Sequence, residues 1–158
     1  MMKKILLILI LLNTVSIFGQ TDATLTGKWK TIEASDSNFH VRNDTITFPE
    51  SYKPYSNEAL QNKRAGILMD YAQNIFVFTA DNGFQYFLSE NPRTLTFDGT
   101  YHITEKGKLL LKVTYPGKIK IEKRAEYIFK DGKLHLKMDA ERQEGVNYVL
   151  EKIEWCGM

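Results

Sequence analysis

Apolar and polar residues alternate along most of the second half of the chain, from Asp98 to Ile153. A period of two places alternate side chains on opposite faces of a β-strand. Each segment therefore has one apolar face and one mostly polar face, as in an antiparallel sheet that covers a core on one side. The apolar positions are Leu109, Leu111, Val113, Tyr115, Tyr127, Phe129, Leu134, Leu136, Met138, Tyr148 and Leu150.

Short turn signals separate these segments. Asp131-Gly132 lies between two alternating runs and is a strong signal for a two-residue hairpin. Pro116-Gly117 fits a type II turn, because proline fixes φ and glycine accepts a positive φ. Such connections are too short for a parallel crossover, so neighbouring strands should pair antiparallel. We predict an all-β fold, an antiparallel up-and-down β-barrel of about eight strands, with an open meander as the alternative.

One stretch departs from the β pattern. Residues 56–73 place Leu60, Ile67 and Tyr71 within one helical stripe, and either Ser56 or Asn57 is suited to cap the start. We therefore expect one inserted α-helix there, after a second strand within residues 39–48. The helix would cover an open end or side of the barrel, or act as a lid over a ligand.

The chain begins with features of a secretory leader. Lys3 and Lys4 precede an apolar run from Ile5 to Leu12, and Gly19 is followed by a polar residue. We expect residues 1–19 to be a signal peptide and residues 20–158 to form a single domain that is secreted or periplasmic. The apolar run is short for a membrane span and lacks a following lipoprotein cysteine. We therefore expect no integral membrane segment after cleavage.

Charge and cysteine content argue against a nucleic-acid partner and against a disulfide-stabilised fold. Loss of Lys3 and Lys4 with the leader would reduce the 21 basic residues to 19, which equals the number of acidic residues. A neutral chain gives no electrostatic reason to expect nucleic acid as a partner. Cys156 is the single cysteine, so the fold has no internal disulfide.

The start and end of the mature chain carry a family resemblance. Gly27 and Trp29 match the Gly-x-Trp signature of the first strand of lipocalin-type barrels, and residues 78–84 and 148–153 support the same comparison. The chain resembles the lipocalin-like proteins secreted by Bacteroidetes-type bacteria. This resemblance implies an up-and-down barrel with a ligand cavity and a late-strand arginine that packs on the tryptophan. Arg124 and Arg142 are the candidates for that arginine.

Residues that carry chemistry are scattered. None of the histidines has a second ligand at a metal-binding spacing, and no nucleophile or phosphate-loop motif occurs. We therefore predict no catalytic residue, no metal and no cofactor. An enzyme is the alternative, in which Glu33, Asp98 and Glu126 would meet inside the barrel. The three histidines are His40, His102 and His135.

The run from Lys118 to Arg124 is basic. Its lysines alternate with Ile119 and Ile121, which predicts that they share one strand face. A solvated outer face that discourages edge pairing is the simpler interpretation. A patch for an anionic partner is the alternative.

Aromatic residues supply the candidate site. An eight-stranded barrel is wide enough either to be filled by side chains or to hold one small ligand, and both outcomes stay open. We expect exported, non-catalytic binding of a small apolar or amphipathic molecule in the barrel interior. The alternative is an envelope protein-interaction module, of inhibitor or immunity type, that uses residues 56–73 and the adjacent loops. The inward-facing ligand-binding candidates are Trp29, Phe84, Tyr86, Tyr101, Tyr115, Tyr127, Phe129 and Tyr148.

Overall fold

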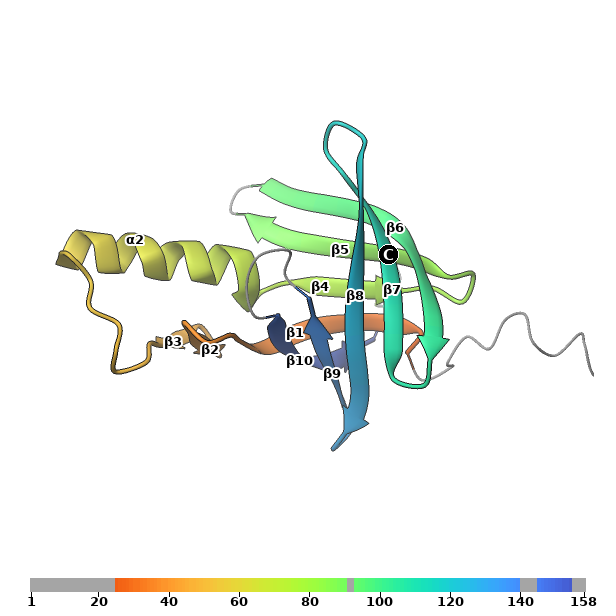
Figure 1. The fold of residues 1–158 in the computed structure, drawn as a ribbon, viewed down its shortest axis with the longest axis horizontal. Coiled ribbons are helices and arrows are strands. Elements are labelled where there is room, and N and C mark those ends of the chain that lie inside the picture. The colour runs from red at the N-terminus through yellow and green to blue at the C-terminus, as the bar shows by residue number, and fades with distance from the viewer. Residues whose placement is uncertain (1–24, 91–92, 140–144, 155–158) are drawn as a thin grey trace, which may run out of the picture.

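Eight strands form a closed antiparallel barrel, seen in Figure 1. The computed structural model describes residues 25–90, 93–139 and 145–154, with the side chains of residues 89, 90, 93 and 94 left out. The predicted leader, Arg142 and Cys156 lie outside the described residues. The barrel strands are β1 (Gly27–Ser35), β4 (Ile75–Phe78), β5 (Gly83–Glu90), β6 (Arg93–Glu105), β7 (Lys108–Tyr115), β8 (Ile119–Lys130), β9 (Lys133–Met138) and β10 (Val146–Ile153).

The sheet closes where its last strand meets its first. From β4 to β10 each strand pairs with the next along the chain, and β10 also pairs antiparallel with β1. In that pairing Lys28 lies opposite Ile153, and Trp29 lies opposite Lys152. Closure leaves the barrel strands without a free edge. The predicted up-and-down barrel is therefore confirmed.

The tight turns follow the chemistry of their residues. Asp131 and Gly132 both take positive φ, 52° and 72°, as a type I′ hairpin requires. Gly117 has φ 84° in the turn after Pro116. The predicted turns at both places are confirmed.

The expected second strand is instead a hairpin outside the barrel. Asn43 and Asp44 take φ 47° and 60° and join β2 (His40–Arg42) to β3 (Thr45–Thr47). The hairpin can lie outside the barrel because the first half of β1 pairs with β4 and its second half pairs with β2. A register shift between Thr31 and Glu33 separates the two halves. The helix thus follows a short extension of the sheet and not a second barrel strand.

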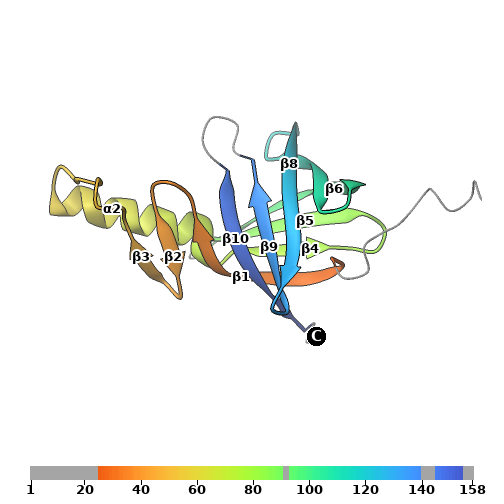
Figure 2. The ribbon, with the colours of Figure 1, turned by 60° about the horizontal axis from the view of Figure 1, so that its bottom comes forward.

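The predicted helix forms in two parts. Helix α2 (Asn57–Ile67) begins at Ser56, whose hydroxyl accepts a hydrogen bond from the Ala59 N–H at 3.1 Å. It continues as a single π-helical turn, η2 (Leu68–Ala72). Figures 1 and 2 show α2 projecting beyond the barrel beside the β2–β3 hairpin. The π-turn η2 packs against the barrel strands β1 and β5 and against β2, and Ile67 at the end of α2 is buried in the core. No helix in the described part of the chain is long and apolar enough to cross a membrane.

Candidate functional site

The two ends of the barrel differ in their covering. At one end, the tryptophan end, the indole of Trp29 is 3% exposed and donates a hydrogen bond to the Leu25 carbonyl at 2.8 Å. The ammonium of Lys152 lies 5.4 Å from the centre of the indole ring. At the other end, the helix end, η2 lies across the barrel and the ring of Tyr71 is 6.4 Å from that of Tyr148.

Side chains fill the middle of the barrel. Phe76, Tyr101 and Leu111 are each 0% exposed, and Leu136 is 1% exposed. Water therefore reaches almost none of the surface of these four residues. A ligand therefore has no room among these side chains, and the filled-interior alternative holds there.

The eight aromatic candidates all belong to the core or pack against it, as the alternation predicts. Ligand contact by these residues stays a prediction. The set divides by depth. The buried members are Trp29, Phe84, Tyr101, Tyr127 and Tyr148, and the half-buried members are Tyr86, Tyr115 and Phe129.

The inner wall remains partly exposed at the helix end. Along β5 burial falls from Phe84 at 1% exposed to half-buried Leu88, and along β7 it falls from Val113 at 3% to half-buried Tyr115. The same change occurs along β6, β8, β9 and β10. We call this partly exposed wall the mouth. Its residues are Tyr86, Leu88, Leu95, Tyr115, Ile121 and Lys123.

Lys123 is a cation on the inner face. It lies directly opposite Leu111 in the β7–β8 pairing, and Ile121 lies opposite Val113. Directly paired residues share a face of the sheet, and both β7 partners are buried in the core. The Lys123 ammonium lies 5.5 Å from the centre of the Tyr115 ring and forms no ion pair with any described residue. Among the described residues, the mouth therefore combines an apolar wall with a positive charge that has no carboxylate partner.

A series of ring contacts connects Lys123 to the floor of the mouth. The centre of the Tyr115 ring is 4.9 Å from that of Phe97, which is 5.8 Å from Tyr86. Tyr86 in turn lies 4.7 Å from Phe76 on β4. Contacts at these separations hold the rings in fixed relative positions. The mouth thus has an ordered aromatic wall that crosses four strands.

A buried amide connects this wall to η2. The Asn74 side-chain N–H donates to the Asp70 carbonyl at 2.5 Å and to the Tyr86 hydroxyl at 2.7 Å. The Tyr86 hydroxyl also bonds that of Tyr148. Asn74 therefore ties the π-turn to the barrel wall.

The tyrosines under η2 stay neutral at physiological pH. Burial raises the pKa of Tyr86 and of Tyr148 well above 10.0, the ordinary value, and also raises that of Tyr71. Their hydroxyls therefore serve as hydrogen-bonding groups and not as anions.

These raised pKa values predict an alkaline loss of stability. The folded protein holds the phenolic protons more tightly than the unfolded chain, so stability is intact below about pH 10 and falls as the pH rises above it. Denaturant midpoints measured between about pH 8 and pH 12 should show this fall. The fall in stability should be smaller in Tyr86→Phe, because this variant lacks one phenolic proton with a raised pKa. A pH profile identical to that of the wild-type protein would contradict the raised pKa of Tyr86.

One expectation about the basic run was wrong, and one of the two arginine candidates is excluded. Lys123 does not share the solvated face of the basic run, because the two-residue period that starts at Ile119 places it on the apolar side. Arg124 lies exposed on the outer face of β8 and does not reach the tryptophan. Lys152, on the last strand, is the cation that packs on Trp29. The period from Ile119 was the signal in the sequence that would have identified Lys123.

The structure separates the three carboxylates that the enzyme alternative requires. Asp98 and Glu126 are exposed on the outer face, and Glu33 forms an ion pair with His40 at 2.9 Å. These three carboxylates therefore do not meet inside the barrel. Within the described residues, no three His, Cys, Asp or Glu side chains are grouped so that they could hold a metal ion.

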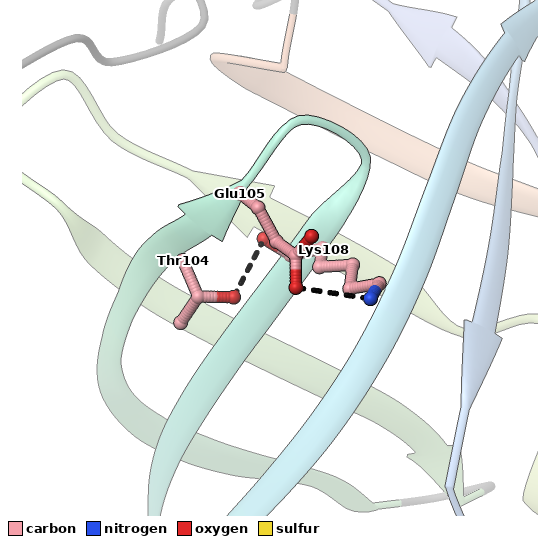
Figure 3. A network of polar contacts seen from close by, with 3 residues as sticks. All are labelled: Thr104, Glu105 and Lys108. Carbon is pink, nitrogen blue, oxygen red and sulfur yellow. Dashed lines mark hydrogen bonds and ion pairs between the residues drawn. The ribbon is translucent and has the colours of Figure 1, made fainter.

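A groove of about 460 Å³ runs over the outer face of β8, β9 and β10, beside the β6–β7 turn. Figure 3 shows that turn, where the Lys108 ammonium meets Glu105 at 2.9 Å and the Thr104 hydroxyl points to the Lys108 carbonyl. The lining includes Lys106, Lys108, Lys137 and Glu126, and Ile128 in the groove is 64% exposed. Neither its charge nor its shape selects one class of ligand.

Comparison with known proteins finds similarity to a solved structure at low sequence identity. No family model matches the chain, and no curated protein matches it. A crystal structure of an uncharacterized protein from Bacteroides eggerthii is similar, with 13% sequence identity and a TM-score of 0.43. The match covers 82% of this chain and 99% of that one. At this level the similarity carries no argument about function.

Proposed function

We propose that this protein is an exported, lipocalin-like binding protein for a small amphipathic molecule with an anionic group, held at the mouth of the barrel. The observation that carries the proposal is Lys123, a cation that forms no ion pair with any described residue and lies on a partly exposed, mostly apolar inner wall. The site is shallower than the interior cavity that the sequence suggested, because side chains fill the middle of the barrel.

The wall suits an apolar ligand body. Leu88, Leu95 and Ile121 offer aliphatic surface, and the rings of Tyr86 and Tyr115 are already ordered by their neighbours. Small-molecule sites are commonly of this kind, mostly apolar with a few polar groups that set orientation. A ligand that covers this wall removes apolar area from water, which contributes roughly 25 cal/mol per Å².

Removal of the Lys123 charge tests the proposal. Lys123→Met keeps the aliphatic stem and deletes the ammonium. The affinity for dodecanoate, measured by displacement of anilinonaphthalene sulfonate, should fall roughly ten-fold, because a hydrogen bond to a charged group contributes about 1.4 kcal/mol or more. The affinity for dodecyltrimethylammonium should not fall.

The matched control lies on the same strand. Lys120 is exposed on the outer face of β8, so Lys120→Met removes the same charge from the wrong side of the sheet. Wild-type affinity is expected for this variant. Equal losses in the two variants, or no binding of dodecanoate by the wild-type protein, would rule out the mouth as the site.

A second candidate function rests on the projection beside the barrel. Helix α2 and the β2–β3 hairpin extend beyond the barrel. Tyr55, which directly precedes the N-cap of α2, is fully exposed. This arrangement suits a protein-interaction module. The exposed α2 residues are mostly polar, and Met69 is the one large hydrophobic residue above a third exposed among residues 56–73. Native mass spectrometry of the exported protein separates the candidates: a bound small molecule favours the first, and a bound protein the second.

A further inference from the structure

Two buried polar atoms beneath η2 lack a hydrogen-bond partner within the described part of the chain: Thr31 Oγ1 and Asn74 Oδ1. Thr31 is 2% exposed and Asn74 is 0% exposed. The two residues are neighbours, because the Thr31 N–H donates to the Asn74 carbonyl at 2.9 Å. Native proteins rarely leave buried polar atoms unpaired, since each loses its bonds to water without replacement.

Rotation of the amide does not remove the problem. The Asn74 Nδ2 group already donates to the Asp70 carbonyl and to the Tyr86 hydroxyl. An exchange of oxygen and nitrogen would point the amide oxygen at the Asp70 carbonyl oxygen, which has no proton to donate. Oδ1 is therefore the acceptor that remains unpaired.

The surroundings of Thr31 are closed but not filled. A crevice beside the β1 bulge is lined by Thr31, Ala34, Val41 and Ala72 and has no space wide enough for a water molecule. Ala72 is the last residue of η2, so the π-turn forms one wall of this crevice. A π-turn of this kind is rare and frequently occurs at functional sites. A movement of η2 would widen the crevice beside Thr31 and would release the Asn74 amide, which bonds η2 at the Asp70 carbonyl.

We infer that η2 is a lid and that Thr31 Oγ1 and Asn74 Oδ1 accept a hydrogen bond from the ligand when the lid opens. This inference rests on the proposed function and extends it to the class of ligand. Tyr86 bonds Asn74 and ends the aromatic wall that begins at Lys123. One ligand along this wall meets the cation at one end and the two acceptors at the other. The ligand is therefore an amphiphile with an anionic group and, at its far end, a hydrogen-bond donor such as a hydroxyl.

Three matched ligands test the inference: dodecanoate, ω-hydroxydodecanoate and ω-methoxydodecanoate. All three carry the anionic group, and only the hydroxy acid carries a donor at the far end. The wild-type protein should bind the hydroxy acid roughly five- to ten-fold more tightly than the methoxy acid. Calorimetric titration measures both affinities.

Thr31→Val removes one acceptor without a change of shape. The variant should lose most of the preference for the hydroxy acid. Its melting temperature without ligand should rise by about 2–4 °C, because an unpaired buried hydroxyl is replaced by an apolar group. Thr96→Val, exposed on the outer face of β6, should change neither quantity.

The outcomes separate the two proposals. Equal affinity for the hydroxy and methoxy acids in the wild-type protein would overturn the inference while dodecanoate binding still supported the proposed function. A preference that survives in Thr31→Val would also overturn it, as would an unchanged or lower melting temperature in that variant. Failure of all three ligands to bind would overturn the proposed function and the inference together.

Discussion

Replacement of Trp29 by alanine is expected to lower the free energy of unfolding by about 3–5 kcal/mol. The indole is buried at the closed end of the barrel, where it contacts the ring of Phe129 at 5.8 Å and bonds the Leu25 carbonyl. Alanine would leave a cavity, an unpaired carbonyl and a Lys152 ammonium without its aromatic partner. Guanidinium unfolding followed by circular dichroism measures the change.

Trp29→Phe is the control for this prediction. Phenylalanine keeps most of the buried ring and loses the hydrogen bond to Leu25, so its cost should be about 1–2 kcal/mol, well below that of alanine. A loss under about 1 kcal/mol for Trp29→Ala would show that the tryptophan does not seal this end of the barrel.

Gly99→Ala is expected to cost about 3 kcal/mol, near the upper end of the usual range for over-filled sites. A methyl group on Gly99 would lie 2.1 Å from the Lys112 carbonyl oxygen and 3.1 Å from the Val113 Cα. Both are backbone atoms of β7, so the strands must separate where β6 and β7 pair. Thermal unfolding of the variant should show the loss directly.

The helix offers a matched control. Gly66 has no atom within 4 Å of the position that a Cβ would take. Gly66→Ala should therefore stabilise the protein by about 0.5–1 kcal/mol, through helix propensity alone. If both alanine variants had the same effect, close approach of β6 to β7 would not be the reason for glycine at position 99.

The alternation of side chains and the turn signals predicted an antiparallel β-meander, for which a closed barrel was the main interpretation and an open sheet the alternative. Local rules govern the strands and turns, because period two fixes the face of residues such as Leu109 and Leu111, and Asp131-Gly132 fixes a hairpin. The eight aromatic candidates faced inward for the same reason. The sequence also favoured closure, because the first strand carries a large apolar residue, Trp29, and apolar and polar residues alternate along the last strand.

Long-range contacts account for what the sequence did not predict. The β2–β3 hairpin leaves the barrel because β1 changes partner along its length, and no local pattern reports such a change. Lys152 reaches Trp29 only across the strands that close the barrel. Asn74 lies in a short link between η2 and β4, outside any periodic segment. No pattern in the sequence therefore predicted that its amide is buried.

Solution mapping of the ligand site tests the central claim most directly. In a spectrum of the isotope-labelled protein, titration with dodecanoate should shift the resonances of Tyr86, Tyr115 and Lys123 at the mouth. Those of Trp29 and Leu25 at the opposite end should stay unchanged. Shifts centred on the tryptophan end, on α2 or on the outer groove by Ile128, or no shifts at saturating ligand, would contradict the account.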